Sequence, residues 1–117
     1  MTPTPAERGR VAQSVGAGLR YIFGSQRDDG AWTDWALPPG PSCTWTTAYV
    51  AYALAGVVRC AAFRAAARLR AAGGYLLENQ NPDGGWGYNA SVDSDADSTA
   101  LSILALSSAG FAVPPAA

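Results

Sequence analysis

QRDDGAW at residues 26–32 and QNPDGGW at residues 80–86 share one frame: a glutamine, three variable residues, a glycine, one further residue and a tryptophan. Each copy follows an apolar, helix-like stretch and leads to a Thr-Ala pair, at residues 47–48 or 99–100, that opens a second apolar stretch. A unit of helix, glycine-rich turn and helix that recurs after about fifty residues is typical of stacked helical hairpins. The repeat therefore predicts an all-α fold built from α/α hairpins.

The residues common to the two turns have structural roles that follow from their chemistry. Glycine adopts turn conformations that other residues avoid. A tryptophan can pack against the end of the preceding helix, and a glutamine can hydrogen-bond the backbone groups that a helix end exposes. We expect such bracing, with ligand contact as the alternative, for the six frame residues: Gln26, Gly30, Trp32, Gln80, Gly84 and Trp86.

The second copy adds an acidic segment, DSDADS at residues 93–98, directly before its Thr-Ala pair. The first copy has CTWT at residues 43–46 in the corresponding stretch. One interpretation is helix capping: Asp97 or Ser98 would be the N-cap, and the other acids would complement the positive end of the helix dipole.

A calcium loop is a second interpretation of the acidic segment, because Asp93, Asp95 and Asp97 alternate along it. A calcium loop needs a glycine at its sixth position and a carboxylate at its twelfth. These positions are occupied by Ser98 and Leu104. We therefore expect no metal at this segment.

Acid catalysis is the third interpretation. The chain has no histidine and no lysine, which excludes a Ser-His-Asp triad, histidine metal sites, lysine Schiff bases and a Walker lysine. Any acid-base work must then come from carboxylates, Tyr, Cys or Arg. Crowding carboxylates together raises the pKa of one of them and keeps it protonated. Asp97, with Asp95 and Ser98 as the neighbours that tune it, is the candidate proton donor.

These motifs resemble those of the squalene-hopene and oxidosqualene cyclases, and of class II terpene cyclases more widely. The two turn frames are similar to that family's QW motif, and DADSTA at residues 95–100 resembles its D-x-D-D-T-A segment. Ser98 stands where the family has its last aspartate, and the family's proton-donating middle aspartate falls on Asp97. Over roughly residues 15–110, the resemblance implies a fragment of the terpene-cyclase α/α barrel that acts on a hydrophobic isoprenoid or polyene substrate without a cofactor.

Aromatic side chains could line an apolar substrate pocket, because π-faces stabilise carbocations. The alternative is plain core packing, which is the more common role of aromatic residues in apolar helices. A diphosphate could bind Arg59, Arg64 and Arg68, although a solvated helix face is the favoured explanation for these arginines. The candidate substrate-binding residues are Trp35, Trp45, Tyr49, Tyr52 and Tyr88.

The composition is that of one globular domain, with 117 residues, 49% of them hydrophobic and 15% charged. A net charge of -1 gives no general attraction to nucleic acid or to an anionic membrane. We expect no nucleic-acid partner and at most peripheral membrane contact. Residues 36–58 carry no charge, but prolines interrupt the first part of this stretch, which favours a buried helix over a membrane span.

Cys43 and Cys60 flank the second apolar stretch. If the stretch is helical, they lie about 20 Å or more apart, whereas a disulfide needs Cα atoms within about 7 Å. Two free thiols, and an N-terminus without the shape of a signal peptide, favour a cytoplasmic location. Met1 and the Pro-Ala tail favour an independent chain over a domain cut from a longer cyclase.

Apolar periodicity predicts four helices, at about residues 6–24, 44–58, 61–78 and 98–109. We expect a single QW-repeat domain, residues 1–117, whose repeats at about 6–58 and 61–110 form two antiparallel hairpins. The first helix is expected to turn one apolar stripe to the core: Val11, Val15, Leu19, Ile22 and Phe23.

Two hairpins are too few to enclose a barrel pocket, and a stacked repeat leaves an uncovered face at each end. We therefore expect a homo-oligomer, most simply a twofold dimer; the alternatives are a companion protein and a ligand that covers the concave face. The leading functional hypothesis is acid-initiated cyclisation of a polyene with Asp97 as proton donor. The alternative is a non-catalytic module that binds a hydrophobic chain or acts as companion subunit of a biosynthetic enzyme. A dry pocket into which Asp97 points distinguishes the first from the second.

Overall fold

The computed structural model describes residues 2–34, 36–37, 40–61 and 65–111. Its elements are α1 (Pro5–Ser25), β1 (Ala36–Leu37), β2 (Gly40–Pro41), α2 (Cys43–Ala61), α3 (Ala65–Glu78) and α4 (Ala96–Ser108). The two short strands form a minimal antiparallel ladder, with Ala36 opposite Pro41 and Leu37 opposite Gly40. All other regular structure in the described part of the chain is helical, so the prediction of an all-α fold is confirmed.

Local sequence explains where two of the helices begin. Thr4 caps α1: its hydroxyl accepts the N–H of Glu7, whose carboxylate accepts the N–H of Thr4, a reciprocal capping box. Asp95 caps α4 by accepting the N–H of Ser98. The expectation that Asp97 or Ser98 is the N-cap is therefore wrong, and α4 begins at residue 96 rather than 98.

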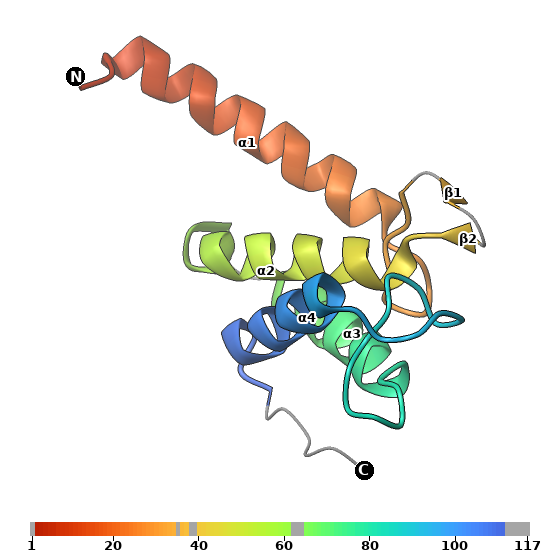
Figure 1. Cartoon of the computed structure of the whole chain (residues 1–117). Coiled ribbons are helices and arrows are strands. Elements are labelled where there is room, and N and C mark those ends of the chain that lie inside the picture. The colour runs from red at the N-terminus through yellow and green to blue at the C-terminus, as the bar shows by residue number, and fades with distance from the viewer. Residues whose placement is uncertain (1, 35, 38–39, 62–64, 112–117) are drawn as a thin grey trace.

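Three helices form the body of the molecule. The most extensive packing joins α2 to α4, followed by α2 to α3 (Figure 1). The helices meet at small residues, which lets their backbones approach closely. The buried alanines at these contacts are Ala48 and Ala51 of α2, Ala72 of α3 and Ala105 of α4. α2 and α4 run in the same direction, since Trp45 lies near the start of α4 and Ala55 lies near its end.

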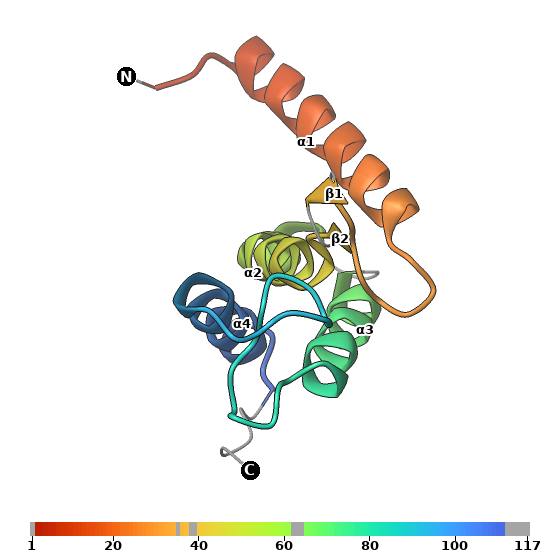
Figure 2. The ribbon, with the colours of Figure 1, turned by 45° about the vertical axis from the view of Figure 1, so that its right-hand side comes forward.

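α1 does not form the predicted hairpin with α2. It leaves the body at a steep angle, so that its N-terminal end lies far from α2 in both views (Figures 1 and 2). No residue of α1 is buried. The expected apolar stripe is divided: Leu19, Ile22 and Phe23 pack against the core, while Val11 and Val15 are exposed.

The C-terminal end of α1 is held by a clamp from α3. The guanidinium of Arg68 donates to the carbonyl of Phe23 over 2.7 Å and lies 4.8 Å from the centre of the Phe23 ring. The side chain of Gln26 donates in return to the carbonyl of Arg68 over 3.0 Å. Arg68 is thus used for bracing. Within the described residues, no helix combines the length and the apolarity that crossing a membrane requires.

Candidate functional site

The two glycine-rich turns have the same internal geometry. The indole N–H of Trp32 donates to the carbonyl of Ile22 over 2.8 Å, and that of Trp86 donates to the carbonyl of Leu76 over 2.7 Å. Both tryptophans are buried. Each indole thus satisfies a carbonyl near the C-terminal end of the preceding helix, where intrahelical partners run out.

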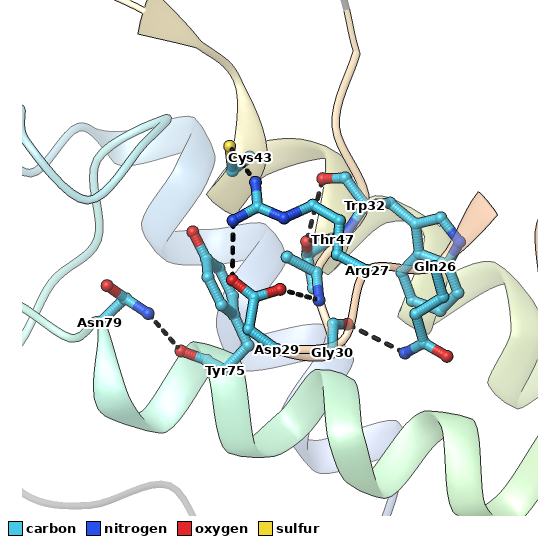
Figure 3. A network of polar contacts seen from close by, with 10 residues as sticks. Gln26, Arg27, Asp29, Gly30, Trp32, Cys43, Thr47, Tyr75 and Asn79 are labelled. Carbon is cyan, nitrogen blue, oxygen red and sulfur yellow. Dashed lines mark hydrogen bonds and ion pairs between the residues drawn. The ribbon is translucent and has the colours of Figure 1, made fainter.

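The glutamine of each frame closes the turn that follows it. The side-chain amide of Gln26 donates to the carbonyl of Gly30 over 2.9 Å (Figure 3), and that of Gln80 donates to the carbonyl of Gly84 over 2.7 Å. Both glycines have positive φ, 93° and 90°, a conformation that other residues adopt only at a cost. At Gly30 a Cβ would also lie 2.1 Å from the carbonyl oxygen of Ala71.

The threonine of each Thr-Ala pair connects the turn to the following helix. The backbone N–H of Trp32 donates to the Thr47 hydroxyl over 2.8 Å, and the backbone N–H of Trp86 donates to the Thr99 hydroxyl over 2.9 Å. Each hydroxyl donates back to the carbonyl of the same tryptophan. The sequence pattern alone predicted no role for these threonines. Their repetition at corresponding positions was the signal that could have identified them.

The position of the acidic segment is set by the second turn, because this turn fixes the residue at which α4 begins. The Asp95 N–H donates to the carbonyl of Trp86 over 3.0 Å. Asp95 accepts two bonds from Ser98, from its backbone N–H over 2.7 Å and from its hydroxyl over 3.0 Å. The Ser98 hydroxyl thus donates to Asp95, and within the described residues no hydrogen bond joins it to Asp97.

Asp97 differs from Asp95 in its exposure and in its hydrogen bonds. It lies in the first turn of α4, with its side chain exposed. Within the described part of the chain it makes neither a hydrogen bond nor an ion pair. Its carboxyl group is therefore available to a ligand, whereas that of Asp95 is committed to the helix cap.

An open cavity of about 540 Å³ lies beside the start of α4. The start of α2 forms another part of the cavity wall. It is held against the second turn region by the backbone N–H groups of Thr44 and Trp45, which both donate to the carbonyl of Tyr88. The residues that line the cavity are Asp34, Ser42, Trp45, Tyr88, Asp95, Ala96, Asp97 and Ser98.

The cavity contains the three acidic-segment candidates and two of the five aromatic ones, Trp45 and Tyr88. Tyr49 lies one turn further along α2, where its ring stacks on Trp45 at 5.5 Å between centroids and 6° between planes. Tyr52 is exposed beyond it, and Trp35 lies outside the described residues. Asp34 and Ser42 were not predicted as site residues, because they border the first turn region without forming a motif.

A second polar cluster braces the first turn (Figure 3). The guanidinium of Arg27 pairs with Asp29 over 2.8 Å and donates to the sulfur of Cys43 over 3.4 Å. Tyr75 lies in the same cluster, and burial raises the pKa of its hydroxyl. Cys43 is a free, buried thiol. The side chain of Cys60 lies outside the described residues, and the described residues include no group of three that could hold a metal ion.

Comparison with known proteins identifies the fold. The family model of the A-macroglobulin TED domain matches residues 2–102. The D109A variant of the type II terpene cyclase MstE from Scytonema, solved in complex with the product merosterolic acid A, superposes with a TM-score of 0.77 at 24% identity, over 87% of this chain. A protein from Actinoplanes superposes with a TM-score of 0.74 at 35% identity, over 85% of this chain. No curated protein sequence matches.

The chain spans about 30% of the length of these solved structures. The superposition confirms the resemblance to type II terpene cyclases, and the helices α1 to α4 correspond to part of that α/α fold. By the extent of the family match, the chain belongs to the family of the A-macroglobulin TED domain.

Proposed function

We propose that this chain forms the acid-bearing wall of a pocket in which an isoprenoid polyene is cyclised, with Asp97 as the proton donor. One observation carries the proposal. Two neighbouring aspartates divide their tasks: Asp95 holds the start of α4, and Asp97 presents an uncommitted carboxyl group to the cavity. The helix cap itself uses only the carboxyl group of Asp95.

The reaction begins with transfer of the Asp97 proton to one carbon of an alkene, or to the oxygen of an epoxide. A new C–H or O–H bond forms, positive charge develops on carbon, and Asp97 is left as a carboxylate. Ring closure transfers the charge along the chain until a proton is lost. The faces of Trp45 and Tyr88 line the same cavity and supply the π-density that stabilises such cations.

Water must be kept from the cation, because it would trap it. The cavity of this chain is open, and the chain spans only about 30% of the cyclase that it superposes on. The proposal therefore requires further protein to cover the cavity. We assign Asp95 and Ser98 as positioning residues, which fix the turn from which Asp97 projects, and we take the described helices as one QW-repeat domain.

A binding module is the second candidate function. Trp45, Tyr49 and Tyr52 form an exposed aromatic row along α2, which suits an apolar chain that is held without being converted. In this role Asp97 would be an ordinary exposed carboxylate, and the protein would carry a hydrophobic chain or serve as companion subunit of a biosynthetic enzyme.

Asp97→Asn separates the two functions, because asparagine retains the shape of the side chain but has no acidic proton. Asp93→Asn is the matched control, since Asp93 is an exposed aspartate of the same segment outside the cavity. We expect Asp97→Asn to abolish cyclisation of a linear polyene while the melting temperature and polyene binding stay unchanged, and Asp93→Asn to behave as wild type. Binding without turnover in the wild-type protein would instead support the binding module.

A further inference from the structure

The most unusual feature of the molecule is a helix of 21 residues with no buried side chain. α1 contains four glycines, each of which costs roughly 1 kcal/mol relative to alanine in a helix interior. Gly9, Gly18 and Gly24 have open space where a Cβ would be. The described residues thus supply no packing partner for most of α1.

The internal repeat shows which partner is missing. Gln26 and Gln80 are 54 residues apart, so Val11 corresponds to Ala65 and Val15 to Leu69. In α3 these positions are covered: Ala65 is 1% and Leu69 6% exposed. In α1 the same positions are 59% and 48% exposed.

α2 is the main cover of α3. The two helices run antiparallel, because Leu69 lies near Ala55 and Tyr75 lies near Cys43. By the same repeat, α1 needs a helix of the α2 type before it, and α1 is the first helix of the described chain.

At the opposite end of the molecule, α4 also has an uncovered face. α4 is the repeat counterpart of α2, since Thr47 and Thr99 make the same bonds to their turns. By this alignment Ile103 corresponds to Ala51, which is 2% exposed, whereas Ile103 is 40% exposed. α2 is covered by α3, but α4 is followed by no helix of the α3 type in the described residues.

We propose that a second copy of this chain covers these faces, with α1 of one copy packed on α4 of the next as α3 packs on α2. Charge supports this arrangement. The packing of α3 on α2 places the C-terminal end of one helix beside the N-terminal end of the other. Arg20 in the last turns of α1 would then lie near Asp95 at the start of the neighbour's α4, because Asp95 is the repeat counterpart of Cys43.

The two faces differ, so the contact is head-to-tail rather than twofold. Such a contact closes into a ring or continues as an open assembly. Each added copy extends the row of α2-type helices beside the cavity. This inference does not depend on catalysis, since it follows from packing alone.

The test uses two variants of exposed residues, Val15→Asp on α1 and Ile103→Asp on α4, followed by sedimentation velocity. We expect the wild-type chain to form species of two or more copies at micromolar concentration, and each variant to sediment as a 12.1 kDa monomer. Gln13→Asp, which adds the same charge to the opposite side of α1, should associate as the wild type does. Circular dichroism checks that each variant is folded, and Val11→Asp replaces Val15→Asp if the latter is not.

Mixing the two monomeric variants is the decisive step. Val15→Asp retains an intact α4 face and Ile103→Asp retains an intact α1 face, so a head-to-tail contact predicts a mixed dimer and nothing larger. A monomeric wild-type protein would overturn the proposal, as would a mixture that stays monomeric. Association of Val15→Asp equal to that of the wild type, or loss of association in Gln13→Asp, would also overturn it.

Discussion

Replacing Trp86 with alanine tests whether the glycine-rich turns hold the fold together. The Trp86 side chain is 0% exposed, and its indole N–H donates to the carbonyl of Leu76 over 2.7 Å. Truncation of a buried tryptophan to alanine costs about 3–5 kcal/mol. The carbonyl of Leu76 keeps a second donor, the N–H of Asn79 at 3.2 Å, so no full penalty for an unsatisfied acceptor is added.

We therefore expect Trp86→Ala to lower the free energy of unfolding by about 4 kcal/mol, a large share of the roughly 5–15 kcal/mol of a small domain. Urea denaturation followed by circular dichroism measures this. Trp45→Ala is the matched control: Trp45 is 36% exposed and only stacks on Tyr49, so about 1 kcal/mol is expected. Equal losses in the two variants would refute the bracing role.

Three further predictions concern single residues. Gly30→Ala should destabilise by at least about 2 kcal/mol in urea, because positive φ costs 1–2 kcal/mol and its Cβ would meet the Ala71 carbonyl; wild-type stability would contradict this. Asp95→Ala should cost about 1 kcal/mol as a lost cap and Asp97→Ala almost nothing, and the reverse order would show that the cap is misassigned. Burial raises the pKa of the Tyr75 hydroxyl, so the stability that the neutral hydroxyl contributes is complete below about pH 10 and is lost as the pH rises through the folded pKa. Above that pH, the melting temperature of Tyr75→Phe should therefore fall less steeply with pH than that of the wild type. Equal falls in the two proteins would contradict this prediction.

The sequence predicted the parts of this fold that depend on neighbouring residues. The spacing of glutamine, glycine and tryptophan within each frame was sufficient, because all three act within one turn and the preceding helix end. The cap was misassigned because Asp95, Asp97 and Ser98 are all good N-caps by type. The choice among them comes from the bond between the Asp95 N–H and the carbonyl of Trp86, which fixes where α4 begins.

The position of α1 could not be predicted from its own pattern. Its stripe of apolar residues indicates that one face is covered, but not by which helix. Leu19 and Ile22 pack on this chain and Val11 does not. The candidate cavity was limited in the same way: the pattern selected Trp45 and Tyr88, while Asp34 and Ser42 enter the cavity only through folding.

An isotope measurement shows whether Asp97 starts a cyclisation by donating a proton. The associated wild-type protein is incubated with a linear polyene in deuterium oxide, and the products are analysed by mass spectrometry. Because the Asp97 carboxyl proton exchanges with solvent, we expect a cyclised product from an alkene substrate to carry one deuterium on the carbon that received the proton. With an epoxide substrate, the deuterium would lie on the new hydroxyl group, from which it later exchanges. Asp97→Asn should give no such product. A cyclised alkene product without deuterium, or no cyclised product from the associated wild-type protein, would show that Asp97 does not start a cyclisation.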